Sequence, residues 1–313
     1  MARPERIYKD IFPAVSVPLK PDFTPDEKQY VPYLEWLAGF DEIRGVVANG
    51  HTGEIVTWST EERAAITKMT ADAVGDRKLI VSGVQAEGTI PAIKEAQAAE
   101  KAGADAILLM PPHNWLRFGM HRDAPYAYFS EIAKNISIDI IVHLYPFGTK
   151  AFYPIETRLK LAEIPNVKCV KDGTRQMAVY EQGVRIMREK APDITIITCM
   201  DEYLMTSMFP RVDGALIGFG SCIPDLICPA WKAMKAEDMK LARQYADRIF
   251  PMAEAIYGIG QPSGEAHARL KEALRQRGHF DNALMREPVL PLDEKEIQQV
   301  ANAIKAAGLS KVK

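Results

Sequence analysis

Residues 79–110 have the sequence LIVSGVQAEGTIPAIKEAQAAEKAGADAILLM, in which two short apolar runs flank a helical pattern. The runs at 79–84 and 106–110 are rich in Leu, Ile and Val, which is typical of strands covered on both faces. Between them, Thr89 can cap a helix, and Gly103 fits just past its end. This unit predicts two parallel strands joined by a crossover helix.

The same alternation of strand and helix recurs about eight times along the chain. The predicted strands are residues 11–19, 43–48, 79–84, 106–110, 138–144, 167–171, 194–198 and 214–219. Helix starts are predicted at Thr24, Ser59 and Asp293, each with a Glu three residues later. No Gly-rich dinucleotide motif follows the first strand, so the pattern favours an α/β fold of the (β/α)8 TIM-barrel type. We expect this barrel to be the catalytic domain and to span residues 1–228, followed by a C-terminal helical region at 229–313.

The composition excludes several classes of protein. The formal net charge of −2 offers no basic surface for nucleic acid or anionic lipid. No apolar stretch approaches the roughly 20 residues that span a bilayer, and no apolar segment of a signal peptide follows the charged N-terminus. The four cysteines, Cys169, Cys199, Cys222 and Cys228, form no CxxC pair, which favours reduced, buried thiols. We therefore expect a cytoplasmic protein without nucleic-acid or membrane partners.

Lys171 ends an apolar strand, at the edge of the barrel where catalytic residues of this fold lie. Burial lowers the pKa of an ammonium group, and a neutral amine can attack a ketone to form a Schiff base. The alternative is a structural lysine that reaches out to solvent, a description that fits Lys168 better because it has the opposite strand parity. The position therefore favours Lys171 as a nucleophile.

A glycine-rich loop, Gly-His-Thr-Gly-Glu at residues 50–54, follows the second predicted strand. Gly50 and Gly53 allow a tight turn whose backbone N–H groups can point at an anion. The carboxylate of a 2-keto acid is the natural ligand for such a turn. A plain Gly-rich turn without a ligand is the other interpretation.

Together these segments resemble the dihydrodipicolinate synthase and N-acetylneuraminate lyase family of class I aldolases and dehydratases. Residues 50–54 resemble its GTTGE loop, residues 169–173 its Schiff-base strand, residues 143–146 its YxxP motif, and the Leu-Pro-Leu at 290–292 also fits. The resemblance implies a pyruvate-type lyase (aldolase, hydratase-aldolase or dehydratase) with an imine on Lys171, no cofactor, and a homotetramer built as a dimer of dimers. The substrate-binding residues that it implies are Gly50, Thr52, Gly53, Tyr145 and Gly218.

The chain departs from the family at three positions that relay protons. The family uses a Tyr, a Thr and a second Tyr from the neighbouring subunit, whereas the matching positions here are His143, His51 and His113. We interpret this as a coordinated change that poises the relay closer to neutral pH, with His143 as the acid/base. Three unrelated histidines are the alternative, and Tyr145, which has the same strand parity as His143, could supply a phenol instead.

A second departure concerns the partner substrate. Dihydrodipicolinate synthases hold its carboxylate with an arginine at the position of Gly148, and here only Lys150 is near. We therefore predict that the chain is not dihydrodipicolinate synthase itself and acts on a sugar-derived or aromatic keto acid. Trp115, Phe147 and Phe152 would suit an apolar substrate tail.

Three other functions remain open from the sequence. The three histidines could bind zinc, with Asp201 or Glu202 as a further ligand, in a metal-dependent lyase. Residues 218–221 could form a phosphate-binding loop, as in many phosphosugar barrels. The chain could also be a non-catalytic relative that binds keto acids.

Overall fold

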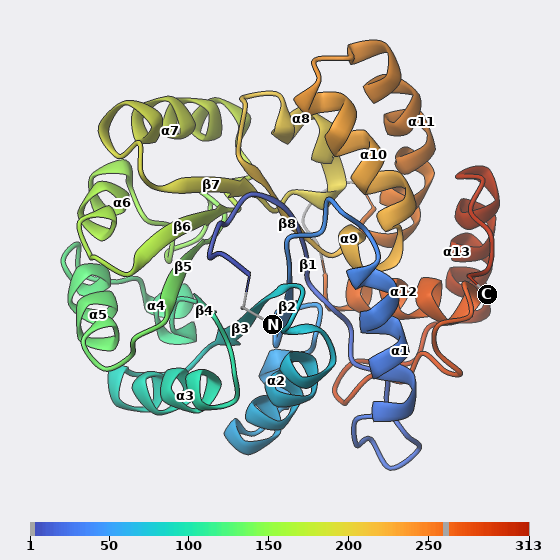
Figure 1. Cartoon of the computed structure of the whole chain (residues 1–313), viewed down its shortest axis with the longest axis horizontal. Helices are drawn as coiled ribbons and strands as arrows, with labels where there is room; N and C mark the ends of the chain where they lie inside the picture. Colours follow the sequence, from blue (N-terminus) through green and yellow to red (C-terminus); the bar gives the residue numbers. More distant parts are fainter. Residues whose placement is uncertain (1–3, 259–262, 313) are drawn as a thin grey trace.

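In the computed structural model, which describes residues 4–258 and 263–312, eight parallel strands form one sheet that curls into a barrel (Figure 1). The sheet order is β1-β8-β7-β6-β5-β4-β3-β2. Single bridges from Ile11 to Ile43 and from Ala14 to Val47 connect its two ends. The strands are β1 (Asp10–Pro13), β2 (Gly45–Ala48), β3 (Leu79–Val84), β4 (Ala106–Leu109), β5 (Asp139–Leu144), β6 (Val167–Asp172), β7 (Thr195–Thr198) and β8 (Gly214–Ile217).

Helices surround the barrel and cover the outer face of its strands (Figure 1). The helices of the barrel are α1 (Glu27–Ala38), α2 (Thr60–Val74), α3 (Thr89–Lys101), α4 (His113–Phe118), α5 (Ala124–Ala133), α6 (Ile155–Ala162), α7 (Met177–Lys190), α8 (Leu204–Met208) and α9 (Phe219–Cys222). Two short 3₁₀ turns follow β2 and β7, at Ile55–Thr57 and Asp201–Tyr203. The predicted (β/α)8 barrel is thus confirmed.

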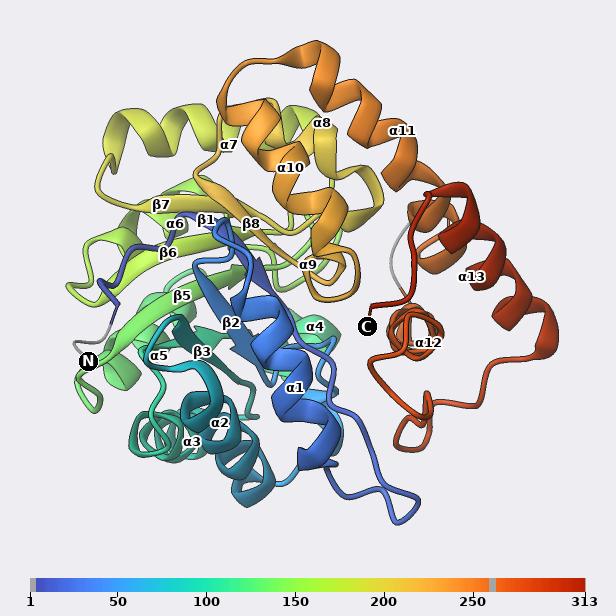
Figure 2. The ribbon, with the colours of Figure 1, turned by 45° about the vertical axis from the view of Figure 1, so that its right-hand side comes forward.

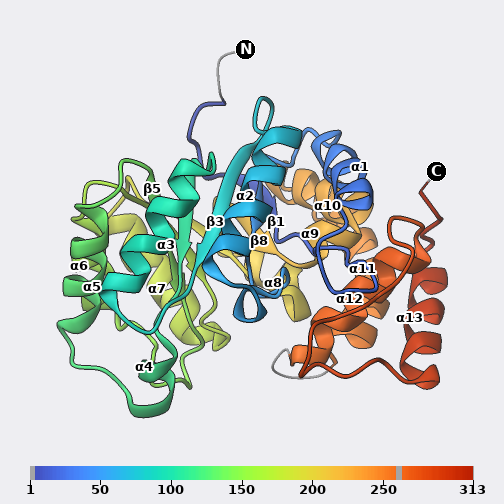
Figure 3. The ribbon, with the colours of Figure 1, turned by 90° about the horizontal axis from the view of Figure 1, so that it is seen from below.

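Four further helices form the C-terminal part, and α12 lies between the barrel and α13 (Figures 2 and 3). They are α10 (Pro224–Lys235), α11 (Met239–Ile256), α12 (Gly264–Gln276) and α13 (Glu294–Ala306). The predicted boundary at residue 229 lies inside α10, and the division into two regions stays a prediction. No helix in the described ranges is long and apolar enough to cross a bilayer.

The structure corrects two local predictions near the N-terminus. The first strand ends at Pro13 rather than at residue 19, although residues 11–19 are all buried, because that run packs into the core without continuing the ladder. Helix α1 begins at Glu27, capped by Asp26. Thr24, which we expected as the cap, instead donates its hydroxyl to Asp22. The capping boxes predicted at Ser59 and Asp293 are both formed.

Candidate active site

A cavity of about 290 Å³ opens at the carboxyl ends of the strands, where (β/α)8 enzymes have their active sites. The predicted site residues that line it come from the loop after β2, from β5 and its end, from β6 and from the loop after β8. They are Gly50, His51, Thr52, His143, Tyr145, Lys171 and Gly218. The fold therefore brings together residues that lie far apart in the chain, from Gly50 to Gly218.

Lys171 lies on the inner face of β6 and is only 9% exposed. Lys168, three positions earlier on the same strand, is exposed, as the strand alternation predicts. Burial lowers the pKa of Lys171, and the positive charge of Arg175 lowers it further, whereas Cys199 and Asp201 act in the opposite direction. A larger fraction of this amine is therefore neutral near pH 7 than in a solvated lysine.

His143 is the register partner of Lys171 across the β5–β6 pair, so the two residues stand side by side. A register shift between Ile140 and Ile141 precedes this pairing. The His143 imidazole is buried, and its Nδ1 atom has no hydrogen-bond partner in the described structure. Burial lowers the pKa of His143 well below its usual value, and the nearby charges of Lys171 and His51 lower it further. These shifts favour the neutral form of the imidazole near pH 7.

The side chains of His51, His143 and Tyr145 form one cluster. The Tyr145 hydroxyl lies 3.1 Å from His51 Nε2. The centre of the His143 ring is 4.8 Å from that of Tyr145 and 5.4 Å from that of His51. Burial raises the pKa of Tyr145 and, with the charge of Lys171, lowers that of His51 to about 3. Burial therefore moves the pKa values of both histidines below the neutral range that the sequence predicts, because it outweighs their intrinsic basicity.

The loop at residues 50–54 turns tightly, but only part of it faces the cavity. The amides of Gly53 and Ile55 donate to the Gly50 carbonyl. Gly53 does not line the cavity, and a Cβ atom there would lie 2.9 Å from the Val15 carbonyl. This glycine therefore serves the turn rather than the expected contact with a substrate. Gly50, His51 and Thr52 are the loop residues that face the cavity.

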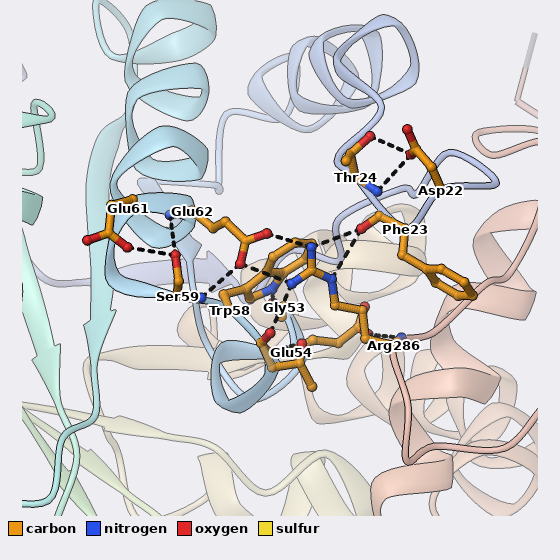
Figure 4. Close-up of polar contacts among 11 residues, drawn as sticks. Asp22, Phe23, Thr24, Gly53, Glu54, Trp58, Ser59, Glu61, Glu62 and Arg286 are labelled. Carbon is orange, nitrogen blue, oxygen red and sulfur yellow. Dashed lines mark hydrogen bonds and ion pairs between the residues drawn. The ribbon is translucent and has the colours of Figure 1, made fainter.

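The C-terminal part of the chain holds this loop from behind. Glu54 and Lys271 form a buried ion pair, and the second Glu54 oxygen accepts a hydrogen bond from the Arg286 amide. Figure 4 shows the Arg286 side chain above the Trp58 ring, 3.7 Å from its centre, with hydrogen bonds to Glu62 and to the Phe23 carbonyl. Trp58 in turn donates to the carbonyl of Gly53 in the loop.

Ten further residues of the described ranges line the cavity, and four of them have side chains whose role there the sequence does not predict. They are Arg175 after β6, Asp201 after β7, Tyr257 at the end of α11 and His267 on α12. Burial and the charge of Lys171 lower the pKa of His267 to about 4. The sequence gives no sign of this position, because His267 is one residue in an amphipathic helix whose packing the pattern does not define. Asp201 was considered only as a metal ligand.

The loop after β8 is not free to bind phosphate. Asp201 accepts hydrogen bonds from the amides of Gly218 and Phe219, which are the donors that a phosphate would need. Burial raises the pKa of Asp201 to about 7. A Cβ atom at Gly218 would lie 2.4 Å from the Tyr257 hydroxyl, so a glycine is required at this close approach. The phosphate-loop interpretation is therefore wrong for this arrangement.

Several predicted residues lie outside the cavity. His113 is exposed at the start of α4, and its backbone amide donates to Glu87. Lys150 is also exposed and donates to the Arg117 carbonyl. The three aromatic residues expected to hold an apolar tail, Trp115, Phe147 and Phe152, do not line the cavity. The rings of Phe147 and Phe152 stack edge-on against each other. The structure therefore gives the aromatic-substrate hypothesis no support.

The histidines do not form a metal centre in the described part of the chain. No group of three or more His, Cys, Asp or Glu side chains within residues 4–258 and 263–312 has the arrangement that holds a metal ion. His51 uses Nε2 in its contact with Tyr145, and His113 lies outside the cavity. The four cysteines are all buried and free, as predicted.

Comparison with known proteins agrees with this geometry. Residues 8–307 match the model of the dihydrodipicolinate synthetase family. The 4-hydroxy-tetrahydrodipicolinate synthase of Bartonella tribocorum is 31% identical over 91% of this chain and 93% of its own length. That of Neisseria meningitidis serogroup B is 29% identical over 94% and 97%.

Solved structures show the same fold. YagE, a prophage protein of Escherichia coli K12 solved in complex with pyruvate, has a TM-score of 0.88 and 22% identity, covering 97% of this chain and 99% of its own. The pyruvate complex of dihydrodipicolinate synthase from Acinetobacter baumannii has a TM-score of 0.84 and 25% identity, covering 97% and 100%. Because the family model matches almost the whole length, the chain belongs to the dihydrodipicolinate synthetase family.

Proposed function

We propose that the chain is a class I lyase that binds a 2-keto acid as a Schiff base on Lys171. The observation that carries this proposal is a buried amine with a lowered pKa in a cavity that the loop of Gly50, His51 and Thr52 also faces. Two solved proteins of the same fold are described in complex with pyruvate, the simplest 2-keto acid. Membership of a family of lyases supports the same chemistry.

The proposed reaction begins when the neutral Lys171 amine attacks the ketone carbon at C2. The carbonyl oxygen leaves as water, and a protonated imine forms. This cation stabilises the electron pair left at C3 when a base removes a C3 proton, or when the bond from C3 to C4 breaks. The resulting enamine can add to an aldehyde or expel a hydroxide as water from C4. These outcomes correspond to an aldolase, a hydratase-aldolase or a dehydratase.

We assign the proton transfer to His143, with His51 and Tyr145 beside it. His143 stands next to Lys171 on the neighbouring strand, and its Nδ1 atom is unoccupied. A neutral imidazole is ready to accept a proton, and the carboxylate of a bound substrate offsets the positive charges that lower its pKa. Tyr145 is bound to His51, which makes the phenol a relay partner for His143 in this proposal.

We further propose that the reaction is not the condensation of dihydrodipicolinate synthase, although the matched relatives carry that name. The position where that enzyme has its carboxylate-binding arginine is Gly148, which has nothing within 4 Å of a Cβ atom placed there. Lys150 is turned toward the Arg117 carbonyl instead. The second substrate therefore differs, in this proposal, from that of dihydrodipicolinate synthase.

The exposed position of His113 supports a role outside its own chain. We propose a cytoplasmic homotetramer in which His113 of one subunit completes the relay of its neighbour. Size-exclusion chromatography with light scattering tests the assembly. A monomer with full turnover would contradict this part of the proposal.

Trapping with borohydride tests the central claim. Incubation with pyruvate and sodium borohydride should add the reduced pyruvyl group to Lys171, detected by peptide mass. Lys171→Ala should abolish the adduct, whereas Lys168→Ala, on the same strand but exposed, should leave it unchanged. No adduct at Lys171, together with chelator-sensitive turnover, would overturn the proposal in favour of a metal-dependent lyase. A 2-keto acid screen with product analysis then separates a lyase from a relative that only binds its ligand.

A further inference from the structure

Arg175 is a cation of the cavity that the proposed imine chemistry does not use. It follows β6 by three residues and lines the cavity with Lys171. Its backbone has a φ of 53°, in the left-handed region that residues other than glycine rarely adopt. Strained backbone of this kind concentrates at binding and catalytic sites. Here it turns a large cationic side chain into the cavity.

A buried carboxylate fixes the orientation of this guanidinium. Arg175 Nε donates to Glu202 Oε1 at 2.6 Å, and both side chains are largely buried. Nη1 makes only a long contact of 3.5 Å with the Gly173 carbonyl. Nη2 forms no hydrogen bond to another residue in the described ranges, and the Arg175 side chain lines the cavity. The fork formed by the two terminal nitrogens is therefore open, which is the geometry that binds a carboxylate in a bidentate way.

The position of Arg175 places it at the far end of a bound keto acid. The loop that takes the first carboxylate follows β2, and Lys171 lies across the barrel on β6. A keto acid bound with C1 at this loop and C2 on Lys171 would direct its remaining carbons toward the mouth of the cavity. Arg175 stands on that side, beyond the last residue of β6, Asp172.

The other groups around the cavity do not replace this cation. The pKa values of His51, His143 and His267 are lowered, which favours their neutral forms, and burial disfavours the charged forms of Lys171 and Asp201. Burial disfavours the charged form of Arg175, but its neighbours, including the Glu202 carboxylate that it hydrogen-bonds, raise its pKa overall. A simple 2-keto acid has one carboxylate, which the loop would hold, so it offers no second carboxylate to the guanidinium of Arg175.

We propose that Arg175 binds a second carboxylate and that the substrate is a 2-keto dicarboxylic acid, with Glu202 positioning the guanidinium. This inference rests on the proposed Schiff-base function and assigns its substrate class. Gly148, which takes the place of the family's arginine, follows β5, whereas Arg175 follows β6. The second carboxylate would therefore occupy a different place in the cavity. Sugar-derived keto diacids belong to this class, whereas aromatic keto acids do not.

A pair of keto acids of equal length tests the proposal. The concentration that gives half-maximal borohydride trapping is measured for 2-oxoglutarate, which has a distal carboxylate, and for 2-oxopentanoate, which ends in a methyl group. The wild-type protein should favour 2-oxoglutarate by about 10- to 100-fold, the range for a charge-assisted hydrogen-bonded pair. Equal values for the two acids in the wild-type protein would overturn the assignment.

Variants of the Arg175–Glu202 pair give results of opposite sign. Arg175→Met combined with Glu202→Gln, which avoids an unpaired buried carboxylate, should remove the preference, whereas pyruvate should still be trapped on Lys171 when each protein is assayed at the plateau of its own pH profile. Glu202→Gln alone should increase the preference, because the guanidinium loses its neutralising partner. The matched control is Arg211→Met with Glu237→Gln, an exposed ion pair, which should change neither value. A preference that survives in the double variant would also overturn the assignment.

Failure of the underlying function would look different. If pyruvate forms no adduct, the Schiff-base proposal fails, but glutarate, a diacid without a ketone, can still report on Arg175. Glutarate should raise the thermal midpoint of the wild-type protein more than pentanoate does, and this difference should vanish in the double variant. An equal shift with both acids would count against Arg175 as the second carboxylate site.

Discussion

His143 and Lys171 are register partners on adjacent parallel strands, and both side chains are buried at the carboxyl end of the barrel. A proton acceptor therefore stands beside the amine on which the imine would form. The pairing depends on the register shift between Ile140 and Ile141, since a slip of one residue would turn one of the two side chains away.

Replacement of His143 separates binding from turnover. His143→Asn should keep borohydride trapping of pyruvate at Lys171 but reduce kcat by about 10²- to 10⁴-fold, because proton transfer is lost while the electrophile still forms. Tyr145→Phe, which removes the hydroxyl bound to His51, should cause a smaller loss. Unchanged kcat in His143→Asn would reject its role, and a larger loss in Tyr145→Phe would transfer that role to the phenol.

The pH dependence of trapping reports the state of Lys171. Imine formation needs the neutral amine, which predominates above its pKa, and this pKa is lowered from 10.5. The trapping rate should therefore rise with pH to a plateau, and the midpoint of this rise should lie below pH 10.5. Arg175→Met with Glu202→Gln removes a positive charge that lowers this pKa, so the midpoint should move to higher pH. A wild-type midpoint at or above 10.5 would show that the amine is solvated.

Two half-buried histidines with lowered pKa values make stability fall in acid. The pKa values of His51 and His267 are lowered in the folded protein to about 3 and about 4, from 6.5. Between these values and 6.5 the unfolded chain binds more protons, so unfolding becomes more favourable as the pH falls through this window. The thermal midpoint should decrease from about pH 7 to about pH 4.5, and His267→Asn should reduce the decrease. A midpoint independent of pH over this range would contradict the assignment.

Removal of the ion pair between Glu54 and Lys271 tests how much this pair stabilises the protein behind the loop at residues 50–54. Lys271→Met leaves the Glu54 carboxylate buried without its cation and should lower the free energy of unfolding by about 3–5 kcal/mol. Lys68→Met, which removes an exposed pair with Asp72, should cost less than about 1 kcal/mol. Urea denaturation measures both. Equal effects of the two substitutions would show that the buried pair contributes no more than a surface pair.

The sequence predicts the barrel and the nucleophile because both depend on local patterns. Continuous apolar runs define the strands, and the position of Lys171 at the end of one of them defines which way it points. The resemblance to a known family adds the loop at residues 50–54. The parts that were missed depend on long-range packing. His267 and Arg175 enter the cavity because a helix and a turn pack against the barrel in a particular way, which no spacing in the chain encodes.

The protonation states could not be predicted either. An intrinsic pKa near 6.5 indicates a relay for neutral pH, but burial against the barrel and the charge of Lys171 lower the pKa values of His51 and His143. The hydrogen bonds of Asp201 could not be predicted from the sequence either. Its carboxylate accepts from two backbone amides that the sequence pattern assigns to a possible phosphate site.

The fastening of the loop at residues 50–54 by Lys271 and Arg286 has a consequence for how the protein is made. A nascent chain that has emerged from the ribosome as far as β8 already contains all eight strands of the described barrel and Lys171. It still lacks the partners of Glu54, which lie 217 and 232 positions further along the chain. The loop at residues 50–54 thus gains these partners only after all eight strands of the barrel and Lys171 have been synthesised.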